Sequence, residues 1–168
     1  NSGFLKETSF QTPIIVVGNL NVGGTGKTPQ IEHLVRFLKD VYKISVLSRG
    51  YKRKTKGFVR LNENHTAKDV GDEPLQYFKK FSQITVAVDE NRVEGVNNLV
   101  QQIAPEVVLL DDAYQHRKIK GSFYILLTKH DDLFTDDFLL PMGNLRESRA
   151  GAKRADLIIV TKCPFDLK

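Results

Sequence analysis

The residues with the clearest chemical meaning lie in a glycine-rich stretch near the start of the chain, NVGGTGKT at 21–28. Its three glycines can adopt positive φ, which lets successive backbone N–H groups point inward and surround an anion. Lys27 and Thr28 stand where a phosphate-binding loop places a lysine for the β- and γ-phosphates and a hydroxyl for Mg²⁺. A plain strand-to-helix turn needs neither residue, so the stretch predicts nucleotide binding.

One position departs from the usual pattern of this loop. The leading glycine falls on Asn21. Asparagine is the non-glycine residue that best accepts left-handed backbone geometry, so we expect the loop to tolerate this change. The residues expected to hold the nucleotide are Asn21, Val22, Gly23, Gly24, Thr25, Gly26, Lys27 and Thr28.

Two neighbouring carboxylates supply the second part of such a site. Asp111 and Asp112 end the apolar run PEVVLLDD at 105–112, where phosphate-loop proteins carry the acid that holds the metal. A carboxylate there binds Mg²⁺ directly or through water and neutralises charge on the γ-phosphate. Strand-end aspartates are also common helix caps, and the sequence leaves open which of the two touches the metal. With Thr28 they form the predicted Mg²⁺ ligands.

A second acidic pair, Asp72 and Glu73, stands directly before Pro74 in DVGDEP at 69–74. An acidic helix N-terminus is one interpretation of this pattern. The other is that a carboxylate here accepts the proton of an attacking hydroxyl group.

The elements that must position these residues indicate an α/β fold. Helical apolar periodicity occurs at 31–38, at 75–81 after Pro74, and at 93–103. Apolar runs without clean alternation, which are typical of strands covered on both faces, occur at 13–18, 44–47, 84–88, 107–110, 122–128 and 157–161. The alternation predicts a P-loop NTPase-like, mostly parallel sheet flanked by helices on both faces. We expect a hairpin within 51–70 and long functional loops over 129–155.

Composition indicates one globular domain over residues 1–168, since 40% of the residues are hydrophobic. The net charge of +5 favours anionic partners. Five cations gather in SRGYKRKTKG at 48–57, a pattern that is more often a solvated loop than a site. A single cysteine excludes a disulfide framework. No run approaches the roughly 20 apolar residues of a membrane span.

Together the motifs resemble the tetraacyldisaccharide 4'-kinase family, the lipid A 4'-kinases of Gram-negative bacteria. GNLNVGGTGKTP, SRGYKRK, DVGDEP, LLDDAYQHRKI and LLPMGNLRE occur in the family's order and span about residues 10–160. The resemblance implies that ATP and Mg²⁺ are used to phosphorylate the 4'-hydroxyl of a tetraacyl disaccharide 1-phosphate. It also implies a peripheral protein that works on an anionic membrane surface, the cytoplasmic face of the bacterial inner membrane.

The same resemblance implies roles for individual residues. Asp72 is the catalytic base, Lys27 binds the ATP phosphates, and Arg92 stabilises developing charge. We expect His116 to be a supporting polar residue. The residues implied to bind the substrate are Tyr51, Glu73, Arg146 and Glu147.

Family members also carry a membrane-associating helix before the first strand and a second domain that supplies a histidine to the base. This sequence shows neither, and it begins with Asn1. We therefore expect residues 1–168 to be the nucleotide-binding half of the kinase, with low activity on its own.

Two other functions fit parts of the sequence. IIVTK at 158–162 resembles the strand before the guanine-reading motif of GTPase-like switches. Cys163 and Pro164 follow it, without the aspartate that discriminates guanine from adenine. A nucleic-acid-binding ATPase is suggested only by positive charge. Because aromatic and basic residues do not interleave, we expect no nucleic-acid partner.

Overall fold

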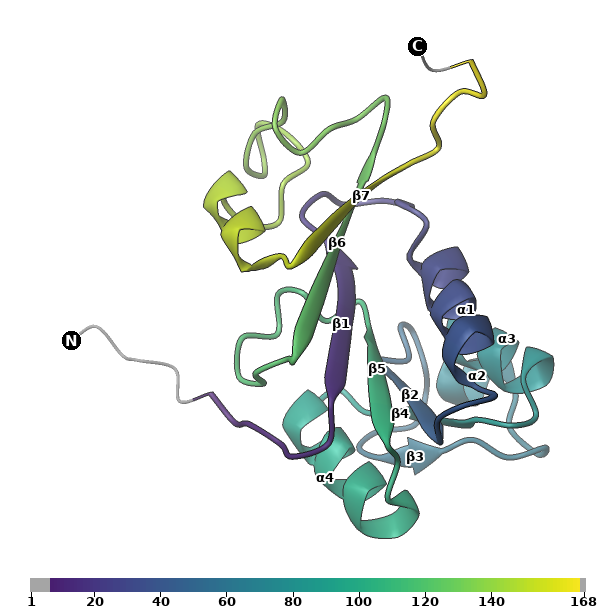
Figure 1. Cartoon of the computed structure of the whole chain (residues 1–168). Helices are drawn as coiled ribbons and strands as arrows, with labels where there is room; N and C mark the ends of the chain where they lie inside the picture. Colours follow the sequence, from purple (N-terminus) through teal and green to yellow (C-terminus); the bar gives the residue numbers. More distant parts are fainter. Residues whose placement is uncertain (1–6, 167–168) are drawn as a thin grey trace.

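A seven-stranded sheet forms the centre of the computed structural model, which describes residues 7–166 (Figure 1). The strand order is β3-β4-β2-β5-β1-β6-β7. Only β3 and β4 pair antiparallel within the described residues; the other pairs are parallel. The strands are β1 (Ile14–Asn19), β2 (Ile44–Ser48), β3 (Val59–Arg60), β4 (Thr85–Val88), β5 (Val107–Asp111), β6 (Phe123–Lys129) and β7 (Leu157–Thr161).

Helices cover both faces of the sheet, as predicted (Figure 1). Val17 and Leu109 face α1 (Lys27–Leu38) and α3 (Asp72–Lys80), whereas the preceding Val16 and the following Leu110 face α4 (Arg92–Ile103). All four side chains are at most 1% exposed. Because successive strand residues point to opposite faces, two covered faces require apolar residues at every strand position. This requirement explains why the runs do not alternate.

The predicted hairpin within 51–70 is wrong. The GFVRL segment does supply β3, but β3 pairs with β4, which lies further along the chain. Residues Ala67–Val70 form the short helix α2. Thr66 and Asp69 form a capping box at its start, with Thr66 N donating to the Asp69 carboxylate over 2.9 Å. This local pair satisfies two helix N–H groups, so the segment turns helical without an apolar period.

Residues 129–155 form the long loops that were predicted, with one short 3₁₀ helix, η1 (Arg149–Arg154), that was not. Phe134 and Leu145 from these loops are buried against Leu20, Tyr114 and Leu126. This apolar cluster fixes the loop beside the carboxyl ends of β1 and β5. Across residues 7–166, no helix is both long and apolar enough to cross a membrane.

Candidate functional site

The turn between β1 and α1 has the geometry of a phosphate-binding loop. Gly23 and Gly26 have φ of 110° and 87°, as expected, whereas Gly24 does not adopt positive φ. Gly26 is the N-cap of α1, and Lys27 is its first residue. The first N–H groups of a helix have no intrahelical partners and carry about half a positive charge. The start of α1 therefore suits an anion.

The loop does not use the left-handed geometry that asparagine can accept at position 21. Asn21 does not have positive φ, and it forms a bridge with Leu145. Its side-chain amide donates to Asp137 over 2.9 Å, and the next residue, Val22, donates its N–H to the carbonyl of Asn144 over 2.8 Å. These two residues thus tie the loop to the segment 137–146, and the Val22 N–H is engaged by the protein itself.

The phosphate loop and the acids at the end of β5 meet on one side of the molecule. Lys27 Nζ lies 3.4 Å from Asp112 Oδ1 and 3.1 Å from Asn19 Oδ1. Arg146 Nη1 approaches the same Asp112 oxygen to 3.2 Å. The Asp112 backbone has φ of 49°, which turns the chain sharply after the strand. One carboxylate therefore holds two cations at the point where phosphates would enter.

Asp111 lies just beneath and is 2% exposed. Tyr77 donates its hydroxyl to Asp111 Oδ2 over 3.2 Å. Burial, together with the nearby Glu73 and Asp112 charges, raises the pKa of Asp111 from its ordinary 3.8 to about 7. Burial also raises the pKa of the Tyr77 hydroxyl. The Asp111 carboxylate is thus poorly stabilised when charged.

These acids fit a bound Mg²⁺. The donors available are oxygens, from Thr28, Asp111 and Asp112, and a divalent cation would stabilise the buried negative charge. Among residues 7–166, no group of three or more His, Cys, Asp or Glu side chains forms a metal cage. Mg²⁺ is usually held by one or two carboxylates together with substrate phosphates and water.

A cleft of about 1020 Å³ opens over this region, at the carboxyl ends of the parallel strands. Ligands bind at this edge in open α/β sheets. The predicted site residues that line the cleft are Gly23, Gly24, Thr25, Gly26, Lys27, Thr28, Tyr51, Glu73, Arg92, Asp112 and Arg146.

Two other predicted residues lie beside the cleft. Asp72 begins α3 and is exposed, whereas its neighbour Glu73 lines the wall. Glu147 is half-buried and accepts hydrogen bonds from Arg154 over 2.7 Å and from Gln115 over 3.3 Å. In this structure Glu147 therefore holds the loop that carries Arg146.

Several residues in and around the cleft were not predicted from the sequence. Asn19 is buried at the end of β1, where its carbonyl accepts from Gln115 and its side chain from Lys27. A polar residue closing an apolar run was the available signal. Lys162 follows β7 and lines the cleft. The adjacent Thr161 hydroxyl donates to Thr25 O over 2.9 Å, which joins β7 to the phosphate loop.

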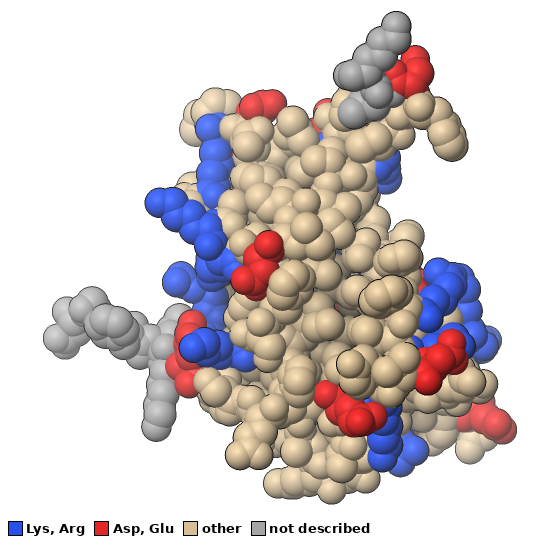
Figure 2. All heavy atoms as spheres, viewed as in Figure 1, with Lys and Arg blue, Asp and Glu red and all other residues tan. Residues whose placement is uncertain are grey.

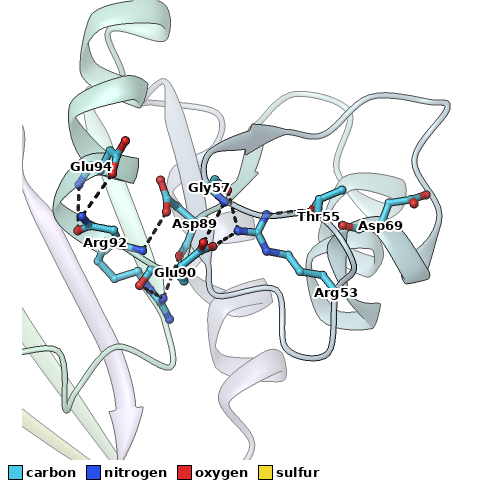
Figure 3. Close-up of polar contacts among 9 residues, drawn as sticks. Arg53, Thr55, Gly57, Asp69, Asp89, Glu90, Arg92 and Glu94 are labelled. Atoms are coloured by element: carbon cyan, nitrogen blue, oxygen red, sulfur yellow. Dashed lines mark hydrogen bonds and ion pairs between the residues drawn. The ribbon is translucent and has the colours of Figure 1, made fainter.

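The basic run at 49–56 contains one residue that is not solvated. Arg53 has a side chain only 4% exposed, and its guanidinium binds the Glu90 carboxylate and Gly57 O (Figure 3). Gly57 N also donates to Glu90 over 2.9 Å. This hydrogen bond is the main cause that lowers the pKa of Glu90 to about 2, with Arg53 contributing.

A second contact holds the same loop. The Thr55 hydroxyl donates to Asp69 O over 2.5 Å. The loop that carries Tyr51 is thereby fastened to the cleft wall.

Comparison with known proteins agrees with this geometry. The family model described as Tetraacyldisaccharide-1-P 4'-kinase (LpxK) matches residues 1–167. The chain belongs to the tetraacyldisaccharide-1-P 4'-kinase family. A tetraacyldisaccharide 4'-kinase of Flavobacterium johnsoniae is 60% identical over 168 residues, which are 99% of this chain and 49% of the relative. One from Bacteroides thetaiotaomicron is 54% identical over 99% of this chain and 44% of its own length.

The fold is also that of a solved LpxK. The crystal structure of LpxK from Aquifex aeolicus in complex with ATP matches with a TM-score of 0.87 and 41% sequence identity. The match covers 95% of this chain and 51% of that one. It confirms the predicted P-loop fold. The chain spans about half the length of the family members that it matches.

Proposed function

We propose that this chain forms the ATP-binding part of a kinase that phosphorylates the 4'-hydroxyl of a tetraacyldisaccharide 1-phosphate, with Mg²⁺ as cofactor. The observation that carries the proposal is the 3.4 Å approach of Lys27 Nζ to Asp112 within one cleft. A phosphate loop and strand-end acids that meet in this way can share one nucleotide and one metal ion. The family membership supports the choice of acceptor.

The geometry supports the following roles in the reaction. Lys27 and the N–H groups at the start of α1 bind the nucleotide phosphates. Thr28 with Asp111 or Asp112 is the ligand set for Mg²⁺, which when bound offsets charge on the phosphate oxygens. The transition state of phosphoryl transfer is loose, so positioning and charge stabilisation matter more than base strength.

The 4'-hydroxyl would attack the γ-phosphorus in line with the departing ADP oxygen. We assign Asp72 to accept the hydroxyl proton, with Glu73 beside it on the cleft wall. Tyr51, which is 69% exposed and lines the cleft, is placed to contact the sugar. Glu73 and Tyr51 line the same cleft, and Asp72 is the residue next to Glu73. We propose that residues 1–168 form a single nucleotide-binding domain.

Replacing Asp72 by alanine should lower kcat about 100-fold or more, the usual scale for removing a general base. The affinity for ATP should stay within about threefold of the wild-type value, because surface substitutions usually have small effects. Asp72 is exposed and lies outside the cleft lining. Steady-state kinetics and an ATP titration measure the two quantities. Glu63→Ala, at an exposed acid, is the matched control. A collapse of ATP binding would instead make Asp72 structural.

Transfer of labelled phosphate from ATP to the acylated disaccharide tests the proposed function directly. The same assay with GTP separates the kinase from a GTPase-like switch. Because we expect low activity from residues 1–168 alone, the assay compares this chain with a longer one that includes the family's second domain. Absence of transfer by the longer chain with both nucleotides, despite ATP binding, would contradict the kinase assignment.

We also propose that the enzyme works on an anionic membrane surface, at the cytoplasmic face of the inner membrane. Figure 2 shows Lys and Arg gathered at the edges of the face drawn. In the basic run, Lys52, Lys54 and Lys56 are exposed. Each surface cation contributes about 1 kcal/mol of attraction to anionic lipid.

Changing Lys52, Lys54 and Lys56 together to glutamine should therefore weaken co-sedimentation with anionic vesicles about tenfold or more. Arg53 is left in place because it is buried and paired. Vesicles of neutral lipid serve as the control. Unchanged binding of the triple variant to anionic vesicles would remove the basic run from membrane association.

A further inference from the structure

Three basic or imidazole groups line the cleft away from the phosphate loop. Arg49 follows β2, Arg92 begins α4 just after β4, and His116 follows β5. In the sheet order, β2 and β4 lie two and three strands from β1, which feeds the phosphate loop. The groups also influence one another electrostatically: burial is the main cause that lowers the pKa of Arg92 and of His116, Arg92 lowers that of His116, and Arg49 lowers both. They therefore form one local cluster.

Arg92 is a buried cation without a carboxylate in ion-pair range among the described residues. It is 3% exposed, and its Nη1 donates only to backbone carbonyls, Asp89 O over 2.9 Å and Glu90 O over 3.4 Å. Its Nε is buried and has no partner. A buried charge and a buried unpaired donor are both costly. A negatively charged ligand in the cleft would satisfy both.

Glu90, two residues before Arg92, directs its carboxylate to other partners. Glu90 lines the cleft, but its carboxylate binds Arg53 and the Gly57 N–H (Figure 3). Asp112, another acid that lines the cleft, is already paired with Lys27 and Arg146. The negative charges of Asp111, Asp112 and Asp89 raise the pKa of Arg92, but among the described residues none of these carboxylates forms an ion pair with its guanidinium.

The other two members of the cluster are also available to a ligand. Arg49 is exposed and forms no hydrogen bond or ion pair through its side chain within residues 7–166. His116 Nε2 is buried without a partner. Two guanidinium groups present planar pairs of N–H donors, an arrangement that matches phosphate oxygens, and an imidazole can add one more donor. Phosphate is therefore the chemical class that the cluster fits best.

We propose that Arg49, Arg92 and His116 form a second phosphate-binding subsite in this cleft, separate from the phosphate loop. Its ligand is either the terminal phosphate of the nucleotide or a phosphate monoester on the acceptor. The choice of these two sources rests on the proposed function. Binding itself can be tested without catalysis.

Calorimetric titration of inorganic phosphate into the protein saturated with ADP and Mg²⁺ tests the subsite. Arg49→Ala and Arg92→Lys should each weaken phosphate binding at least tenfold and leave ADP affinity within twofold. Arg60→Ala, at an exposed cation on β3, should change neither. Arg49 is exposed, so Arg49→Ala keeps the test decisive if Arg92→Lys does not fold. Equal phosphate affinity in Arg49→Ala, Arg60→Ala and the wild type would overturn the proposal.

Two further titrations identify the source of the phosphate. If the subsite takes the terminal phosphate of the nucleotide, Arg49→Ala lowers the ratio of ATP to ADP affinity. If it takes the acceptor's phosphate, glucosamine 1-phosphate binds in the presence of a non-hydrolysable ATP analogue and Arg49→Ala abolishes that binding. If ADP does not bind to the protein, the proposed function fails. If ADP binds but Arg49→Ala changes neither the ratio of ATP to ADP affinity nor the binding of glucosamine 1-phosphate, only the subsite is contradicted.

A double variant tests whether Arg53 keeps Glu90 away from Arg92. Arg53→Ala should lower phosphate affinity, because the freed Glu90 carboxylate competes for Arg92. Adding Glu90→Gln should restore the affinity to within threefold, since the competing charge is gone. Arg53 is thus a positioning residue, and a purely structural role would not be rescued by Glu90→Gln. A double variant as weak as Arg53→Ala would contradict this role.

Discussion

Replacing Lys27 by alanine is expected to lower kcat/KM for phosphate transfer at least about 100-fold, which corresponds to ~3 kcal/mol of transition-state stabilisation. Lys27 begins α1 and is held by Asn19 and Asp112 at the mouth of the phosphate loop. Its charge is therefore already positioned before the nucleotide binds. A preorganised cation of this kind acts most strongly where negative charge develops.

Steady-state kinetics with ATP and the acylated disaccharide measure the effect of Lys27→Ala. Lys39→Ala is the matched control, because Lys39 caps the other end of the same helix and pairs with Asp40. The control should stay within about twofold of the wild type on the scale of a surface change. If Lys27→Ala remained within tenfold of the wild type, Lys27 would not bind the reacting phosphates and the site would need another assignment.

The strands of the sheet were predictable because a strand that is buried on both faces has apolar residues at every position of its sequence. Runs such as 107–110 are apolar at every position, which only a covered strand requires. The short helix α2 shows no apolar helical period, because the capping pair Thr66 and Asp69 stabilises it instead. β3 could be located but not paired, because its partner β4 lies beyond two helices in the sequence.

The candidate site was predictable where one segment supplies the chemistry. The phosphate loop carries its glycines, lysine and threonine within eight residues. Contacts between distant segments were not predictable. The bridge of Asn21 with Leu145 keeps Asn21 out of left-handed geometry. Arg53 looked solvated within a basic run, but Glu90, a distant residue, makes it a buried ion-pair partner.

The buried carboxylate of Asp111 lowers the free energy of unfolding when it is charged. Its pKa is about 7 in the folded protein and about 3.8 when the side chain is freely hydrated. Between these values the folded state binds more protons than the unfolded state, so the free energy of unfolding falls as pH rises. The contribution that neutral Asp111 makes to the free energy of unfolding is fully present below pH ~4 and is lost as pH rises through about 7. It amounts to at most about 4 kcal/mol, at ~1.4 kcal/mol per pH unit.

Replacing Asp111 by asparagine should therefore stabilise the metal-free protein by about 1–4 kcal/mol at pH ~8 and by much less at pH ~5. An asparagine oxygen can still accept the Tyr77 hydroxyl, now without a buried charge. Urea unfolding in the presence of a chelator measures the difference. Asp112→Asn is the control: Asp112 is about a third exposed and pairs with Lys27 and Arg146, so its loss should give no stabilisation.

The same Asp111→Asn variant should lose stabilisation by Mg²⁺ and ATP, because a ligand stabilises a protein only through its affinity for the folded state. The wild type should gain stability when both are added, and the variant should gain much less. A stability difference that is the same at both pH values would show that Asp111 is charged throughout. In that case the buried carboxylate is stabilised by the protein itself, and its proposed need for a cation disappears.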